Sequence, residues 1–282
     1  MSKQKDELGI RMKEYESVSK NFLTLRLPKV IRLDMRAGHT FTKEFNRPYD
    51  EIFSECMKYA TKVCCEEIPD VVMGYTQSDE ISLVINDVSK RDKTSCFFNG
   101  NVEKIVSLSA SKCTIAFNRK FFELVEENKN KPDFIKYKKK LWKAEFDSRV
   151  FCLPNVTEVH NYILWRQNDA TKNSISSLAH TKFTNSELKG KNSNEMQDML
   201  FKEFGINWND YPVEYKRGTC FVKSLYIKNV TLKTGEIIEN VKRKRWEKIE
   251  IPILTKDKEF IVNIFTRKLY FNGTFIEEET GN

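Results

Sequence analysis

Two adjacent carboxylates stand at the tightest turn that this sequence predicts. The segment MGYTQSDEISLVIN, residues 73–86, reads as an apolar strand, a turn and a second apolar strand, with Asp79 and Glu80 where the turn enters the second strand. A third acid, Asp34, ends a separate β-rich run, PKVIRLD. Strand ends and turns can bring distant side chains to one point. Carboxylates gathered there would repel one another unless a cation lay among them.

Magnesium is the cation that suits such a group. It prefers oxygen ligands and bridges protein carboxylates to phosphates. Two ions roughly 3.5–4 Å apart can activate an attacking hydroxyl and neutralise a leaving pyrophosphate. Neighbouring residues face opposite sides of an ideal strand, so only one of Asp79 and Glu80 easily shares a face with Asp34. We therefore rank Asp79 above Glu80 as a direct ligand. Solvated acids in an ordinary turn are the structural alternative.

The elements that must position these acids follow a recognisable order. A strand at 28–34 precedes a helix within 49–70, the hairpin at 73–86 and a long helix at 101–125, each indicated by its apolar spacing. This order predicts an α+β fold with a ferredoxin-like core, in which a palm-like antiparallel sheet carries helices on one face. We expect the other face to be open for a ligand.

The rest of the chain extends this core. Apolar spacing predicts helices over 157–183 and 193–204, and alternation predicts strands at 218–227, 249–254 and 259–265. No repeat or linker is visible. We expect a single domain, residues 1–282, with a palm-like catalytic core (about 1–135) and a C-terminal helical and strand extension (about 136–282).

Composition limits the partners and the compartment. The net charge of +8 favours polyanions such as nucleotides, nucleic acid or an anionic membrane surface. No stretch approaches the 18 or so apolar residues that span a bilayer, and residues 1–16 do not resemble a signal peptide. Seven cysteines without a C-x-x-C pair argue against a disulfide framework or a zinc site. We expect a cytoplasmic protein that does not enter a membrane, with a mitochondrial location left open.

Several motifs occur together in a consistent order. They are VIRLDMRAGHTF, RPYD, GYTQSDEISLV, WRQND and GINWNDYPVEYKRGT. Together they resemble the tRNA-His guanylyltransferase-like family, over roughly residues 8–260. Members of that family resemble conventional palm-domain polymerases but extend RNA in the reverse, 3′-to-5′ direction. Several independent motifs are a more specific signal than one short pattern.

The resemblance implies a role for each matched residue. The catalytic acids would be Asp34, Asp79 and Glu80, and two Mg²⁺ ions would be held by Asp34, Asp79 and the backbone carbonyl of Met35. The resemblance also implies residues that bind the nucleotide triphosphate: Asp34, Met35, Arg36, Ala37, Gly38, His39, Arg47, Ser78, Asp79 and Lys104. Backbone donors and cations are suited to the charge that develops during phosphoryl transfer.

Three departures from the family pattern stand out. Met35 replaces a glycine that usually follows the first aspartate, and Gly38 replaces a phenylalanine. The stretch TKNSISS, beginning at Thr171, replaces the HINNLYN motif of eukaryotic tRNA-His enzymes. In this last respect the chain resembles the guanylyltransferase-like branch, which repairs truncated tRNA 5′ ends on a template.

The resemblance therefore implies a 3′-5′ nucleotidyltransferase that extends tRNA 5′ ends after activation with ATP or GTP. Its partners would be tRNA and nucleoside triphosphates, and its assembly a homotetramer. One alternative is a palm enzyme of the diguanylate cyclase type, and another is a catalytically weak tRNA-binding protein. Two further segments stay open. WRQND is interpreted either as a tRNA or subunit contact or as a core tryptophan with a buried arginine–carboxylate pair, and VKRKRWEK either as an RNA contact or as a solvated turn.

Overall fold

The computed structural model describes residues 6–88, 96–132 and 134–277 of the chain. The strands are β1 (Lys29–Met35), β2 (Val71–Gln77), β3 (Glu80–Ile85), β4 (Phe146–Cys152), β5 (Thr219–Thr231), β6 (Ile237–Glu250), β7 (Leu269–Phe271) and β8 (Thr274–Ile276). The α-helices are α1 (Glu7–Ser17), α2 (Gly38–Phe41), α3 (Glu51–Glu67), α4 (Val102–Glu127), α5 (Phe134–Lys138), α6 (Val156–Ala179), α7 (Asn185–Leu188), α8 (Ser193–Phe204), α9 (Val213–Arg217) and α10 (Glu259–Phe265). Two 3₁₀ helices span Phe97–Gly100 and Trp208–Asp210.

The first half forms a β-α-β-β-α-β core, in which the predicted strand, helix, hairpin and long helix are followed by β4, a strand that was not predicted. Helix α3 begins where the Asp50 side chain accepts the Phe53 amide at 2.9 Å, and α4 begins where Asn101 accepts the Lys104 amide at 2.9 Å. Pro69 follows the end of α3, where it cannot continue the helix. Each long helix thus has a capping residue encoded at its start.

One mixed sheet runs through the described residues, in the order β4-β1-β3-β2-β5-β7-β8, with β6 pairing with β5. All neighbours are antiparallel except β5 and β7, which pair in parallel. Strand β5 pairs with β2 through Thr219 to Val222, so the C-terminal strands extend the sheet of the core. The predicted α+β class with a palm-like antiparallel sheet is confirmed.

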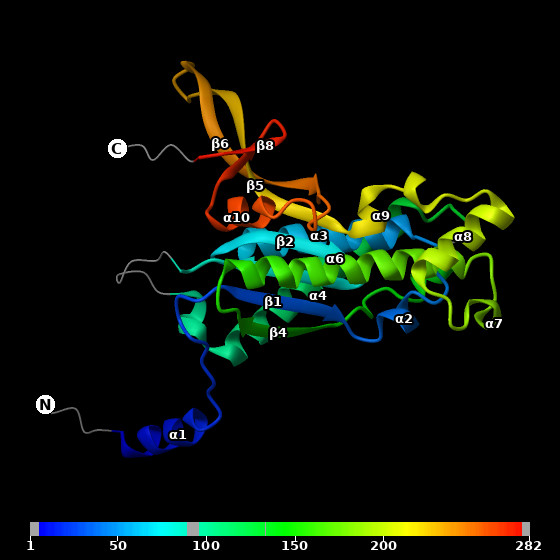
Figure 1. Cartoon of the computed structure of the whole chain (residues 1–282). Helices are drawn as coiled ribbons and strands as arrows, with labels where there is room; N and C mark the ends of the chain where they lie inside the picture. Colours follow the sequence, from blue (N-terminus) through cyan, green and yellow to red (C-terminus); the bar gives the residue numbers. More distant parts are fainter. Residues whose placement is uncertain (1–5, 89–95, 133, 278–282) are drawn as a thin grey trace, which may run out of the picture.

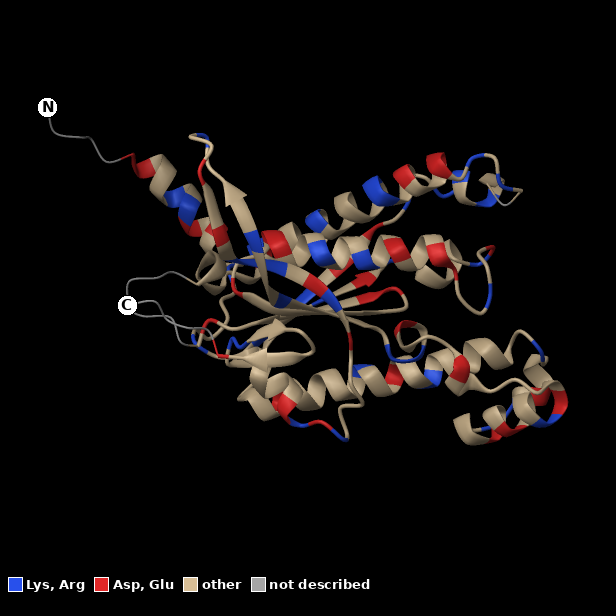
Figure 2. Ribbon diagram, turned by 90° about the horizontal axis from the view of Figure 1, so that it is seen from above, with Lys and Arg blue, Asp and Glu red and all other residues tan. Residues whose placement is uncertain are grey.

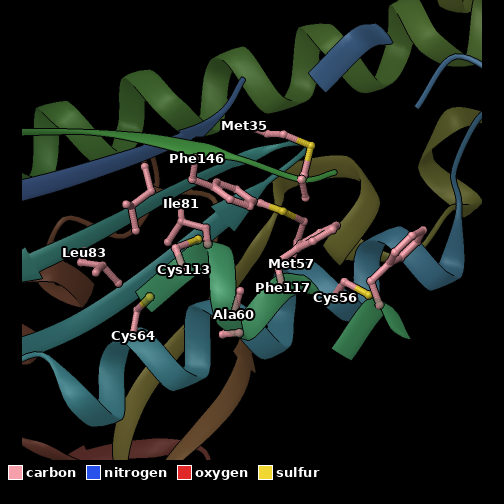
Figure 3. Close-up of a cluster of buried hydrophobic side chains, with 14 of the residues drawn as sticks. Met35, Cys56, Met57, Ala60, Cys64, Ile81, Leu83, Cys113, Phe117 and Phe146 are labelled. Atoms are coloured by element: carbon pink, nitrogen blue, oxygen red, sulfur yellow. The ribbon is translucent and has the colours of Figure 1, made fainter. Parts of the chain in front are cut away.

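Helices α3 and α4 cover one face of the core sheet, as predicted. Their apolar side chains pack with those of β1 and β3 in one buried cluster, which includes Met35, Met57, Phe117 and Phe146 (Figure 3). The other face is not left fully open, because α6 and α10 of the extension lie on it and form a second cluster with Val30, Tyr75 and Val84. Figure 1 shows α6 running across the sheet. At the end of β1 on this face, Asp34 remains partly exposed.

Two predicted strands are wrong. Residues 259–265 form helix α10, because Phe260, Ile261 and Ile264 are buried at helical rather than alternating spacing. In 249–254, strand β6 ends at Glu250 and the rest has no regular structure. The segment VKRKRWEK belongs to β6 rather than to a turn.

Two elements extend away from the body of the molecule. Helix α1 buries none of its residues, and Figure 1 shows it standing apart at one side. The outer parts of β5 and β6 form a two-stranded ribbon that projects from the other side. Figure 2 shows basic and acidic residues together on several helices. The positive charge is therefore not concentrated on a single helix. None of the described helices has the length and apolar content needed to cross a bilayer.

Candidate active site

Three acids lie in one row across the sheet. Asp34 of β1 pairs with Glu80 of β3 on one side and with Asp147 of β4 on the other. Directly opposed residues on neighbouring strands share a face, so all three side chains leave the same face of the sheet. The next row on this face holds Arg32 and Arg149, which pair in the same way. Asp147 and the two arginines were not predicted as site residues, because only the strand register brings them to Asp34.

Asp79 reaches this row from the turn between β2 and β3. Ser78 has a left-handed φ of 50°, and the Asp79 carbonyl accepts the Met35 amide at 3.0 Å. This hydrogen bond ties the turn to the end of β1. The Asp79 carboxylate lies over Gly38, since a Cβ atom at position 38 would be 1.9 Å from Asp79 Oδ2. Asp34 and Asp79 are therefore brought together at one end of the sheet.

The electrostatics of Asp34 reflect this crowding. Burial raises the pKa of the Asp34 carboxyl, and the negative charges of Asp79 and then Asp147 raise that pKa further. Arg32 and Arg149 act in the opposite direction. Burial and neighbouring negative charge thus outweigh the two arginines and disfavour the ionised form of Asp34.

Glu80 has a different environment. Its Oε2 lies 2.6 Å from Arg32 Nη2 and 3.0 Å from Arg166 Nη1 of α6, and Glu80 is only 4% exposed. Burial raises the pKa of Glu80, whereas the two arginines lower it. Its carboxylate is thus engaged by guanidinium groups. Arg166 of the WRQND segment is buried and pairs with Glu80, but its partner within the segment, Asp169, is partly exposed, and Trp165 is 54% exposed and is not a core residue.

The loop after β1 places its residues at the surface. Arg36 forms an exposed ion pair with Glu145 at 2.7 Å, His39 is exposed in α2, and Ala37 adopts a left-handed φ of 53°. Met35 is a regular strand residue and is not among those with a positive φ. Methionine therefore fits this position, because the backbone here does not adopt the positive φ that favours glycine. The Met35 side chain packs into the core, so only its backbone is available to a ligand.

A cavity of about 170 Å³ opens beside this loop. It is lined by Arg47 and Ser78, by the buried end of β2 and by residues of α3, α6 and α9. Tyr49 and Tyr215 stack on each other in its wall, with ring centroids 4.3 Å apart. Burial raises the pKa of Tyr49 to about 12, so its hydroxyl stays protonated at neutral pH. Aromatic walls with polar groups nearby are typical of a pocket for a flat, polar ring.

Within one chain, Lys104 does not lie near the acids Asp34 and Asp79. The Thr114 hydroxyl accepts the amide of Phe146, the strand partner of Met35, so Thr114 marks the level of the acids along α4. Lys104 lies ten residues earlier, about 15 Å back at a helical rise of about 1.5 Å per residue. It contacts Phe98 there. The remaining predicted residues, 34–39, 47 and 78–80, lie on β1, on β3, in the short helix α2 or in the loops beside them.

The donor set at Asp34 and Asp79 fits a hard divalent ion. No cluster of three or more potential metal-ligating side chains occurs in the described part of the chain. Two carboxylates with backbone carbonyls and water are nevertheless the kind of set that Mg²⁺ uses at nucleotide sites. Burial and then repulsion by Asp79 raise the pKa of Asp34, and a cation between the two carboxylates would relieve the repulsion.

Comparison with known proteins decides the family. The family model for tRNA-His guanylyltransferase matches residues 9–154, and the model for the C-terminal domain of the same family matches residues 157–262. The chain belongs to the tRNA-His guanylyltransferase family. The predicted family and the predicted enzyme class, a nucleotidyltransferase, are thereby confirmed.

Relatives in the tRNA-His guanylyltransferase family span a wide range of organisms. The chain is 30% identical to tRNA(His) guanylyltransferase 1 of Arabidopsis thaliana over 77% of its own length but only 37% of that protein. A bacterial tRNA-His guanylyltransferase-like protein in complex with ATP is 37% identical, with a TM-score of 0.76, and covers 92% of this chain and 98% of its own. A bacterial protein of the same description in complex with GTP is 35% identical, with a TM-score of 0.72 and coverages of 92% and 99%.

Proposed function

We propose that this protein adds nucleotides to the 5′ end of tRNA in the 3′-5′ direction. In the first step the 5′ phosphate of tRNA attacks the α-phosphate of ATP or GTP, and pyrophosphate leaves. In the second, the 3′-hydroxyl of an incoming nucleoside triphosphate attacks the activated 5′ phosphate, and the nucleoside monophosphate leaves. The observation that carries the proposal is the meeting of Asp34 and Asp79 beside the cavity lined by Arg47 and Ser78.

Asp34, Asp79 and the Met35 carbonyl would hold two Mg²⁺ ions. Such ions, when bound, lower the pKa of the attacking hydroxyl and offset the charge on the leaving group. The protein's own residues fix where these groups lie. The hydrogen bond from the Met35 amide to the Asp79 carbonyl holds the two ligand segments together, at 3.0 Å. Burial at the sheet end excludes water from one side of Asp34.

The nucleotide would lie between the acids and the cavity. Arg47 is exposed at the cavity edge and donates to the Thr42 carbonyl at 3.4 Å, so its guanidinium can turn toward a phosphate at little cost. Tyr49 and Tyr215 offer a flat wall for a base. The ATP and GTP complexes of the bacterial relatives support nucleoside triphosphates as ligands of this fold.

The tRNA would contact basic surface outside the cavity. Lys242, Arg243, Lys244 and Arg245 follow one another in β6, and Arg245 lies 5.2 Å from the Tyr226 ring. Cations beside aromatic rings suit a phosphate backbone and exposed bases. Because TKNSISS stands in place of HINNLYN, template-dependent repair of truncated tRNA is favoured over addition of a single untemplated guanosine. The proposed assembly is a homotetramer in the cytoplasm.

The test is a 5′-extension assay. Purified protein is incubated with a 5′-truncated tRNA, Mg²⁺ and each labelled nucleoside triphosphate in turn. Template-dependent label at the tRNA 5′ end supports the proposal. Label in a dinucleotide without tRNA would indicate a cyclase, and tRNA binding without any nucleotide transfer would indicate a binding protein. Either of these results overturns the proposal.

A further inference from the structure

Glu80 is the strand neighbour of Asp34 and the chain neighbour of Asp79, yet one of its carboxylate oxygens is bound by two arginines. Arg32 Nη2 and Arg166 Nη1 approach the same oxygen, Oε2, at 2.6 and 3.0 Å. Arg32 comes from the row of the sheet next to Asp34, whereas Arg166 comes from α6, 86 residues along the chain from Glu80. The charge of Glu80 is thus paired with two cations through Oε2, whereas Oε1 is buried without a hydrogen-bond partner.

Arg166 is itself held firmly. It is 4% exposed, its guanidinium carbon lies 3.4 Å from the centre of the Trp165 ring, and its Nη1 is 3.4 Å from Asp169 Oδ2. One helical turn earlier, the Tyr162 hydroxyl is 2.9 Å from the Ser82 hydroxyl of β3. Gln167 bonds the Pro252 carbonyl and the Leu254 amide, at 2.7 and 3.0 Å. Helix α6 is therefore fixed against the strand that begins at Glu80.

We infer that Arg166 is a positioning residue, which binds Glu80 and thereby keeps Glu80 from becoming a third ligand beside Asp34 and Asp79. The inference rests on the proposed function, because it concerns the same metal site. A free carboxylate at position 80 would add a negative charge directly opposite Asp34 and change the ligand set. The planar guanidinium, stacked on Trp165 and aimed at Glu80, prevents this through a bond that lysine cannot reproduce fully.

Divalent-ion binding to the free protein tests the first half of the inference. Mn²⁺ replaces Mg²⁺ as the probe and is titrated by electron paramagnetic resonance in the absence of tRNA. Glu80→Gln keeps an acceptor oxygen for the arginines and is expected to bind Mn²⁺ within about threefold of wild type, as for a substitution that touches no ligand. Asp79→Asn is expected to weaken binding at least about tenfold, as loss of a ligand should. Equal losses from both variants would show that Glu80 is a ligand and overturn the inference.

A double-mutant cycle tests the second half. Arg166→Met is expected to lower kcat for 5′ extension at least about tenfold, the range typical of groups that orient metal ligands, with KM for the nucleotide nearly unchanged. Adding Glu80→Gln to Arg166→Met should recover part of the loss, because the uncovered charge is gone. A double variant at or below the product of the two single effects would mean that Arg166 is merely structural, and would overturn the inference.

Two further variants keep the result interpretable. Arg119→Met removes an exposed arginine of α4, which pairs with Glu123 and has no contact with the acids, and is expected to leave kcat and Mn²⁺ binding unchanged. Arg166→Lys keeps the charge, and it should lose less activity than Arg166→Met and serves if the methionine variant does not fold. Equal losses from the two would contradict a role based on charge. If the protein shows no 5′ extension at all, the Mn²⁺ titrations still decide the role of Glu80 independently of the proposed reaction.

Discussion

The Asp79 carboxylate occupies the space that any side chain at Gly38 would need. A Cβ atom on Gly38 would lie 1.9 Å from Asp79 Oδ2 and 2.8 Å from its Cγ. Gly38 does not have a positive φ, so the glycine is required by this close approach and not by the backbone. The phenylalanine that the sequence resemblance leads one to expect at this position is incompatible with the Asp79 conformation seen here.

Gly38→Ala should therefore displace the Asp79 carboxylate. The clash involves the end of a flexible side chain, so Asp79 can rotate away and the free energy of unfolding should change by less than about 1 kcal/mol. The rate of 5′ extension should fall by about tenfold, since a misplaced ligand weakens orientation of the reacting groups. Thr40→Ala, in the same short helix, is the control that should change neither quantity. Unaltered kinetics in the Gly38 variant would show that the position of Asp79 seen here is not the one used in the reaction.

Asp34→Asn should stabilise the protein against heat when no divalent ion is present. Because the pKa of Asp34 is raised, its contribution favours folding below the ordinary carboxyl pKa of 3.8 and is lost as the pH rises through the raised value. The melting temperatures of variant and wild type should therefore coincide at low pH and diverge toward neutral pH, with the variant higher. Scans in chelator from pH 3 to 8 measure this, with Glu203→Gln as a control for an exposed carboxylate away from the site. A variant less stable than wild type at pH 7 would contradict the conclusion that burial and repulsion disfavour ionised Asp34.

Arg47 and Lys104 should differ in their effects on nucleotide affinity. Arg47 lines the cavity, whereas Lys104 lies about 15 Å away along α4, at a helical rise of about 1.5 Å per residue. Arg47→Ala should raise KM for the nucleoside triphosphate by about tenfold, which is the loss of one phosphate contact of about 1.4 kcal/mol. Lys104→Ala should leave this KM unchanged if one chain forms the whole site. A rise in KM for the Lys104 variant would instead mean that a second copy supplies its Lys104.

The buried ion pair between Lys29 and Asp87 should be essential to stability. The lysine Nζ lies 2.8 and 2.7 Å from the two carboxylate oxygens, and both side chains are almost fully buried. Lys29→Met would leave Asp87 charged and buried, at a cost of about 3–5 kcal/mol in the free energy of unfolding. The double variant with Asp87→Leu should recover much of that loss, since neither charge remains. Denaturant unfolding measures both, and a single variant as stable as wild type would contradict the pairing.

The sequence predicted the elements whose spacing repeats over several turns or strands. The helix expected at 193–204 has those bounds, and the hairpin at 73–86 forms β2 and β3. The short run at 259–265 was wrong because seven apolar-rich residues fit a strand or a helix equally well, and only packing against α6 and β2 decides between them.

The identity of the acids in the site was easier to predict than which residues lie beside them. The alternation of side chains led to the expectation that Asp79 or Glu80, but not both, would join Asp34. In the structure Glu80 is directly opposite Asp34, whereas Asp79 joins it from the turn, where strand alternation does not apply. Neither the register with Asp147 nor the contact of Arg166 with Glu80 leaves a local pattern, because each depends on segments brought together only by the fold.

The most direct test of the account is 5′ extension of a truncated tRNA by wild type, Asp34→Ala and Asp79→Ala under identical Mg²⁺ and nucleotide concentrations. Circular dichroism and tRNA binding verify that each variant is folded. We expect template-dependent extension by wild type and a loss of at least about 10²-fold in both variants, because each removes a group on which the reacting phosphates depend. Near-normal extension by either variant would contradict this expectation.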